Sequence, residues 1–237
     1  MAGRTSIEWA NSTWNPWRGC TKISPGCKNC YMYRDQILFG NKSPNKVIRS
    51  DEYVFTSPLR WKKTGRVFTC SWSDFFIQEA DEWRSEAWEI ISRTPKLTYL
   101  LLTKRPENIS SRLPDNWKNG WDNVWLGVSA ENQHYFDIRV SHLLTLPAKV
   151  RFVSCEPLLE TVTIGNKNKI DWVIVGGESG PNCRKMESQW VKKLRDECLT
   201  YKIPFFFKQW GGVNRKAKGR LLDNRTWDEI PGISTSK

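Results

Sequence analysis

The sequence predicts an α/β protein with a full or partial parallel (β/α) barrel, and three observations support this prediction. Short runs rich in β-branched or aromatic residues recur at intervals of roughly 22 to 33 residues, the length of a βαβ repeat. The runs are continuous rather than alternating, as expected for strands buried on both faces. Nearly every run ends in a cluster of polar residues, and in parallel α/β folds the carboxyl ends of the strands form the face that carries the site. An open doubly wound sheet is the alternative.

Taken in order, the runs predict six strands at 67–70, 98–102, 124–128, 150–153, 172–175 and 205–207, with a shorter strand before Cys20. Apolar residues at helical spacing predict helices at 81–92, 132–146 and 188–201, after a first helix at 31–38. The polar stretch 41–57 is expected to be a loop or a short excursion. These elements predict a single barrel domain over residues 1–211, with an N-terminal cysteine loop at 14–31. Residues 212–237 are predicted to form a basic C-terminal tail.

The composition indicates a globular protein with an anionic partner. The chain has 237 residues, with 37 Lys and Arg against 25 Asp and Glu, and a formal net charge of +12. This excess makes nucleic acid the leading candidate partner, and several of the 14 Trp residues lie in the same loops as the strand-end clusters, where they could stack on bases. No apolar run reaches membrane-spanning length, and the first residues lead into no apolar signal segment. We therefore expect a cytoplasmic protein without a membrane partner.

The cysteine loop is the strongest chemical signal in the sequence. Cys20, Cys27 and Cys30 are separated by six and then two residues, and Gly19, Pro25 and Gly26 supply the turns that such a loop needs. Three thiolates without a nearby His are too few for an ordinary closed zinc site. They suit a [4Fe–4S] cluster in which one iron is left free of protein ligands. A structural zinc completed by a distant residue, or plain reduced thiols, are the alternatives.

The strand-end clusters supply the other candidate site residues. The predicted catalytic residues are Asp74, Cys155 and Glu156, as general acids or bases or, for Cys155, as a hydrogen-atom donor. The predicted substrate-binding residues are Lys104, Arg105, Lys208 and Trp210. Most have a plainer alternative. The carboxylates could hold the cations, Lys104 and Arg105 could form a solvated turn before Pro106, Lys208 could pair with a neighbouring acid, and a buried strand cysteine is usually inert packing.

Several of these segments together resemble one protein family. They are Trp14-Asn15-Pro16 to Tyr31, Ser73-Asp74, Leu102 to Pro106, Val124 to Ser129, Arg151 to Leu158, Asp171 to Gly180, Pro204 to Gly211 and Gly219 to Asp223. The family consists of phage-encoded and bacterial three-Cys-motif, radical-SAM-like proteins of unassigned function. The resemblance implies a barrel related to that of radical SAM enzymes, with Cys20, Cys27 and Cys30 as ligands of the cluster. It also implies the host cytoplasm if the chain is phage-encoded.

Two features depart from radical SAM enzymes proper. Their cysteine motif usually has three and then two residues between ligands, whereas the first gap here is six. Their Gly-Gly-Glu segment, which holds the amine of S-adenosylmethionine, usually follows the second strand, whereas Gly176-Gly177-Glu178 follows about the sixth. Whether the protein uses S-adenosylmethionine as a second cofactor is therefore an open question. If it does, Gly176, Gly177 and Glu178 are expected to lie at its amine, and Ser129 and Ser154 are expected to be polar contacts. Capping of the next helix is the alternative for Glu178.

These observations lead to two hypotheses for function. The first is an iron–sulfur enzyme that modifies or repairs nucleic acid by radical chemistry and takes electrons from an external donor. The second is a zinc- or cluster-stabilised nucleic-acid-binding protein without catalytic turnover.

Overall fold

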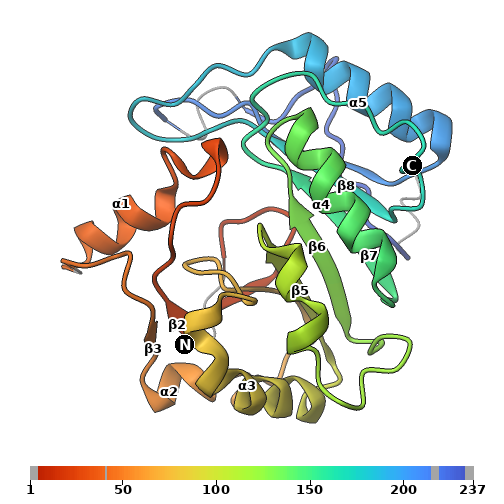
Figure 1. Ribbon diagram of the computed structural model, residues 1–237. Helices are drawn as coiled ribbons and strands as arrows, with labels where there is room; N and C mark the ends of the chain where they lie inside the picture. The colour runs from red at the N-terminus through yellow and green to blue at the C-terminus, as the bar shows by residue number, and fades with distance from the viewer. Residues whose placement is uncertain (1–4, 41, 215–218, 233–237) are drawn as a thin grey trace. The chain divides into compact units, whose positions relative to one another are not determined.

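The computed structural model describes residues 5–40, 42–214 and 219–232, and its α/β class agrees with the sequence prediction (Figure 1). Seven strands belong to one sheet in the order β1-β4-β5-β6-β7-β8-β9, and each strand pair whose register is described within it is parallel. The chain forms two compact units. Unit 1 comprises residues 1–23, 30–126 and 146–149, and unit 2 comprises residues 24–29, 127–145 and 150–237.

Unit 1 contains the first strands and an aromatic core. Its strands are β1 Ser12–Trp14, β4 Gly65–Thr69 and β5 Leu97–Thr103, with the beginning of β6 Val124–Ser129, and a separate antiparallel pair, β2 Trp17–Arg18 and β3 Ile48–Arg49. Its helices are α1 Tyr31–Leu38, α2 Glu52–Phe55 and α3 Asp81–Arg93. The Trp14 ring lies 5.7 Å from the Tyr99 ring, and Trp88 of α3 lies 5.0 Å from Phe75. Many of the tryptophans therefore serve as core residues.

Unit 2 continues the β/α pattern. Its strands are β7 Val150–Cys155, β8 Trp172–Gly176 and β9 Phe205–Gln209, and its helices are α4 Gln133–Thr145 and α5 Ser188–Tyr201. All five residues of β8 are buried, as its continuous apolar run predicts. None of the helices in the described ranges is long and apolar enough to span a membrane.

The described part of the predicted tail packs against β9. Asp228 forms an antiparallel bridge with Phe206, and the Arg220 guanidinium lies over the Phe206 ring at 5.1 Å. The predicted tail residues 215–218 and 233–237 lie outside the described ranges. The bounds of the six main predicted strands and of the four predicted helices lie within two residues of the observed ones. The stretch 41–57, predicted to be a loop or a short excursion, contains β3 and α2. Asp51 begins α2 by accepting the Val54 N–H at 2.9 Å.

Candidate functional site

The predicted site residues are divided between the two units. Unit 1 carries Cys20, Cys30, Asp74, Lys104 and Arg105. Unit 2 carries the remaining ones, which are Cys27, Ser129, Ser154, Cys155, Glu156, Gly176, Gly177, Glu178, Lys208 and Trp210. The cysteine loop itself leaves unit 1 at residue 24 and returns to it at Cys30. No disulfide joins any of the cysteines, all of which lie in the described ranges.

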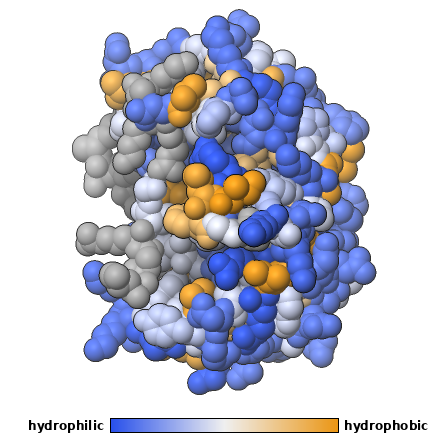
Figure 2. Space-filling view, turned by 90° about the vertical axis from the view of Figure 1, so that its left-hand side faces the viewer, coloured by the Kyte–Doolittle hydropathy of each residue, from blue (hydrophilic) through white to orange (hydrophobic). Residues whose placement is uncertain are grey.

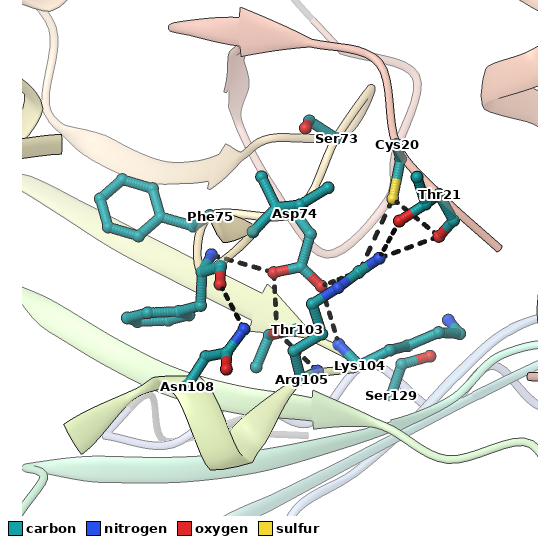
Figure 3. A network of polar contacts seen from close by, with 12 residues as sticks. Cys20, Thr21, Ser73, Asp74, Phe75, Thr103, Lys104, Arg105, Asn108 and Ser129 are labelled. Carbon is teal, nitrogen blue, oxygen red and sulfur yellow. Dashed lines mark hydrogen bonds and ion pairs between the residues drawn. The ribbon is translucent and has the colours of Figure 1, made fainter. Parts of the chain in front are cut away.

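In unit 1, Asp74 and Arg105 form a buried ion pair at the carboxyl ends of β4 and β5 (Figure 3). Asp74 Oδ1 accepts from the Phe76 N–H at 2.9 Å and the Thr103 hydroxyl at 2.7 Å. Asp74 Oδ2 accepts from the Lys104 N–H at 3.0 Å and from Arg105 Nη1 at 3.2 Å. Four donors surround this carboxylate, and through one of them it orients the Arg105 side chain.

Arg105 in turn contacts the cysteine loop. Its Nη2 donates to the carbonyl of Thr21 at 2.9 Å and to the Thr21 hydroxyl at 2.7 Å, and its Nη1 lies 3.7 Å from Cys20 Sγ. Burial alone would lower the pKa of Arg105, but the charges of Asp74 and of a Cys20 thiolate outweigh burial, and the pKa is raised. A fixed cation beside a sulfur favours the thiolate form. The predicted substrate cation is therefore already engaged with Cys20.

The backbone on either side of Cys20 is also fixed within unit 1. The Ser73 hydroxyl donates to the Gly19 carbonyl at 2.6 Å, and the Gly19 N–H donates to the Trp72 carbonyl at 3.0 Å. The Tyr33 hydroxyl, from α1, donates to the Cys20 carbonyl. Cys30 occupies the position just before the first residue of α1. Residues from three separate stretches thus determine where Cys20 lies.

In unit 2, the segment that carries Cys27 is held by a buried carboxylate. Glu131 follows β6, is fully buried, and accepts the Gly26 N–H at 3.0 Å through Oε1. Its Oε2 accepts from Arg139 Nη1 of α4 at 2.9 Å, and Arg139 also donates to the Ser129 carbonyl at 2.7 Å. This ion pair fixes the residue next to Cys27.

Glu178 holds the same segment from the end of β8. Its carboxylate accepts from Asn29 Nδ2 at 2.9 Å, from the Arg184 N–H at 2.8 Å, and from the Arg184 guanidinium. Arg184 also donates to the Pro25 carbonyl at 3.0 Å. Burial raises the pKa of Glu178, but the hydrogen bonds from Arg184 and Asn29 outweigh burial, and the pKa is lowered. Glu178 does not cap the next helix, because these partners lie elsewhere and α5 begins only at Ser188.

The two glycines before Glu178 permit close backbone contacts. A Cβ on Gly177 would lie 2.0 Å from the Trp210 carbonyl oxygen, and the Gly177 N–H donates to the Gln209 carbonyl at 3.0 Å. A Cβ on Gly176 would lie 2.6 Å from Glu156 Oε1. Gly177 therefore excludes a larger residue because its neighbour is backbone, whereas a Cβ on Gly176 would require the Glu156 side chain to shift.

Glu156 and Lys208 form an ion pair between the ends of β7 and β9. Lys208 Nζ lies 2.9 Å from Glu156 Oε2, with both side chains largely buried, as the plainer alternative for Lys208 expected. Glu156 Oε1 and Ser154 Oγ are buried and have no hydrogen-bond partner among the described residues. Buried polar atoms without a protein partner carry a free-energy cost, which a hydrogen bond to solvent or to a polar ligand would relieve.

The other predicted residues of unit 2 have ordinary surroundings. Cys155 is fully buried, and burial, with the nearby carboxylates of Glu156 and Glu131, raises the pKa of its thiol. The Ser129 hydroxyl donates to the Glu156 carbonyl at 3.1 Å. The Trp210 indole donates to the Leu221 carbonyl at 2.9 Å and packs against Phe207. A neutral, buried thiol fits packing better than reactivity.

The donor chemistry of the loop fits an iron–sulfur cluster. Cys20, Cys27 and Cys30 supply three thiol ligands, and Arg105 supplies a cation at one of them. Within the part of the chain that is described, no group of three or more Cys, His, Asp or Glu side chains is arranged to hold a single metal ion. The loop therefore fits a cluster in the kind and number of its ligands, and not in the arrangement of the side chains.

Sequence reasoning missed the residues that fix the loop. Asn29, Arg139 and Arg184 each bind one of the strand-end carboxylates or the loop backbone, and Glu131 binds Gly26 and Arg139. Glu131 had one available signal, because a carboxylate directly after a buried strand and before a helix with an inward Arg is a candidate ion pair. Arg184 had a weaker one, as a cation in a strand-end loop, and Asn29 had none.

A family model with the description "Protein of unknown function (DUF5131)" matches residues 4–231. No curated protein and no solved structure matches the chain.

Proposed function

Because the chain belongs to the DUF5131 family, whose function is unknown, we propose its function from its own residues: an iron–sulfur protein related to radical SAM enzymes that modifies or repairs nucleic acid. The observation that carries the proposal is the cysteine loop. Backbone groups beside Cys20 and Cys27 are bound by side chains of their own units: Arg105 binds Thr21 and Glu131 binds Gly26. The relation to radical SAM barrels rests on the resemblance of the sequence and on the parallel β/α order.

A [4Fe–4S] cluster with three thiolate ligands supplies one iron that a non-protein ligand can reach. Cys20, Cys27 and Cys30 would hold it. Arg105 would keep Cys20 deprotonated and donate an N–H to its sulfur, an interaction that tunes the reduction potential of such clusters. Electrons would come from an external donor.

S-adenosylmethionine is the second cofactor in this proposal. The Glu178 carboxylate already receives donors from Asn29 and Arg184, so a cofactor amine would have to share or displace one of them. Ser154 Oγ and Glu156 Oε1 have buried, unused hydrogen-bonding capacity in the described structure, which suits them to a polar ligand. We therefore rank them above Glu178 as ligand contacts.

The alternative function is a zinc- or cluster-stabilised nucleic-acid-binding protein without turnover, in the cytoplasm in either case. One observation favours it. Asp74 and Glu178, two of the carboxylates at the strand ends, each bind an arginine, Arg105 or Arg184, that also contacts the cysteine loop. Residues used in this way are less available for catalysis.

Anaerobic purification with metal analysis tests the proposal. The protein should be brown, with absorption near ~400 nm from sulfide-to-iron charge transfer, and should contain iron and sulfide. Alanine at Cys20, Cys27 or Cys30 should abolish the colour, whereas Cys183→Ala, the matched control at a half-buried thiol, should retain it. A colourless protein with one stoichiometric zinc would overturn the iron–sulfur assignment. Formation of 5′-deoxyadenosine with S-adenosylmethionine and reductant would then separate an enzyme from a binding protein.

A further inference from the structure

Unit 1 contains a pocket of about 260 Å³ at the start of the cysteine loop. Its lining includes Trp14, Asn15, Arg18, Tyr53, Trp61 and Trp72. The volume lies just below the range of about 300–1,000 Å³ that is typical of small-molecule sites. The pocket thus has room for one small planar group among aromatic rings.

Arg18 gives this pocket a positive charge, and the carboxylate that also lines it, Asp51, accepts the Val54 N–H and forms no ion pair with Arg18 in the described structure. Side chains alternate along a strand, and the neighbouring Trp17 is fully buried with its indole donating to the Asp74 carbonyl at 3.1 Å. Arg18 therefore points the opposite way, into the lining of the pocket. Its Nε is buried and bonds to nothing in the described ranges. A buried donor on a cation costs free energy unless an anion completes it.

The aromatic lining continues onto an exposed surface of unit 1. The Trp72 ring lies 5.6 Å from the ring of Phe39, whose side chain is 76% exposed. Tyr53 is also exposed, and the Arg60 guanidinium lies 4.4 Å from the centre of its ring. Figure 2, which views the side that carries α1, shows hydrophobic side chains gathered among hydrophilic ones. Aromatic faces beside cations are the usual platform for single-stranded nucleic acid.

We propose that this pocket binds one nucleotide of a single-stranded nucleic acid, with the base against the tryptophan rings and the phosphate at Arg18. The net charge of +12 favours a polyanion over an isolated aromatic acid. The proposal locates the nucleic-acid partner and in that respect rests on the proposed function. The pocket lies in unit 1 and its lining includes none of the three loop cysteines, so its occupancy can be measured without a cluster.

The test is a titration of a fluorescein-labelled, single-stranded decanucleotide with the full chain near physiological salt, followed by anisotropy. Arg18→Ala and Trp61→Ala should each raise the Kd by roughly 5- to 150-fold, the loss expected for one phosphate contact or one base stack. Arg93→Ala is the matched control, because it removes the same charge from an exposed position on α3. It should change the Kd less than about twofold, as expected for a rim charge outside the contact.

Competition identifies the ligand. A nucleoside monophosphate should displace the labelled strand from wild type at lower concentration than either the unphosphorylated nucleoside or inorganic phosphate. Equal competition by inorganic phosphate would reduce the site to a simple anion site and overturn the proposal, as would equal Kd values for Arg18→Ala and Arg93→Ala. If Arg18→Ala fails to fold, Arg18→Lys replaces it as the test variant, because lysine keeps the charge and lacks the buried Nε donor. An Arg18→Lys variant that binds the strand with wild-type affinity would also overturn the proposal.

The same titration, run before and after cluster reconstitution, separates this inference from the proposed function. Arg18-dependent binding in a protein that never takes up iron supports the pocket and contradicts the iron–sulfur assignment. Iron uptake without Arg18-dependent binding supports the iron–sulfur assignment and contradicts the proposed nucleotide pocket.

Discussion

Replacing Glu131 by Gln should strongly destabilise unit 2. Glu131 is fully buried and pairs with Arg139, whose side chain is 3% exposed, at 2.9 Å. The amide side chain can still accept the Gly26 N–H, but it leaves the guanidinium without a counter-charge. Removing one partner of a buried ion pair costs about 3–5 kcal/mol. For a chain of this size that cost corresponds to a fall of about 6–20 °C in the unfolding midpoint.

The assay is thermal unfolding followed by circular dichroism, with two companion variants. Glu89→Gln is the matched control, because Glu89 is 65% exposed and pairs with Arg93 of the same helix at 3.5 Å. Such a surface pair is worth less than about 1 kcal/mol, so the midpoint should fall by no more than about 4 °C. Glu131→Gln combined with Arg139→Met should be more stable than Glu131→Gln alone, because no unpaired charge is buried.

Two results would refute this reasoning. Equal midpoints for Glu131→Gln and Glu89→Gln would mean that the buried pair contributes no more than a surface pair. A double variant less stable than Glu131→Gln would mean that the contacts of Arg139 with the Ser129 carbonyl and the Tyr135 ring outweigh the burial of its charge.

Three further predictions concern the segments that hold the loop. Arg105→Ala should slow alkylation of Cys20 at neutral pH, measured by mass spectrometry of the modified peptide, because the thiolate loses its cation; an unchanged rate would contradict the contact at 3.7 Å. The pKa of Glu178 is lowered, so its stabilisation is complete above the unfolded value of about 4.3 and is lost as pH falls through the folded pKa. Glu178→Gln should therefore flatten the acid limb of a stability–pH curve, and a parallel shift of the whole curve would count against this. Gly177→Ala should lower the unfolding midpoint, because its Cβ would lie 2.0 Å from the Trp210 carbonyl oxygen. Gly165→Ala should lower it less, because its Cβ would meet no atom and only the left-handed backbone, with φ of 55°, costs free energy, about 1–2 kcal/mol.

The strands and helices were predictable from the sequence because their signals are local. The continuous apolar run 172–175 predicts a strand buried on both faces, and β8 is entirely buried. The apolar spacing in 188–201 predicts α5 with the same bounds. The short α2 was missed because four residues show no period, and only the cap at Asp51 signals it.

The use of the polar residues was not predictable, because it depends on partners far apart in the sequence. The bond from Gly26 to Glu131 joins residues 105 positions apart, and that from Asn29 to Glu178 joins residues 149 positions apart. The sequence correctly indicated that charge accumulates at the ends of the strands. It could not indicate that Glu131 and Glu178 are satisfied by the loop segment itself.

This use of the strand-end residues bears on how the cysteine loop would take up a cluster. When the cysteine ligands of a flexible loop become ordered around a metal, the loss of backbone conformational entropy costs about 1–2 kcal/mol per residue. Here the backbone beside Cys20 is fixed by Ser73 and Arg105, and the segment around Cys27 by Glu131 and Glu178. These contacts come from the protein itself and would restrict the backbone near the proposed ligands. Carboxylates that serve this purpose increase metal affinity indirectly, so substituting Glu131 or Glu178 should weaken cluster retention even though neither is a ligand in the proposed function.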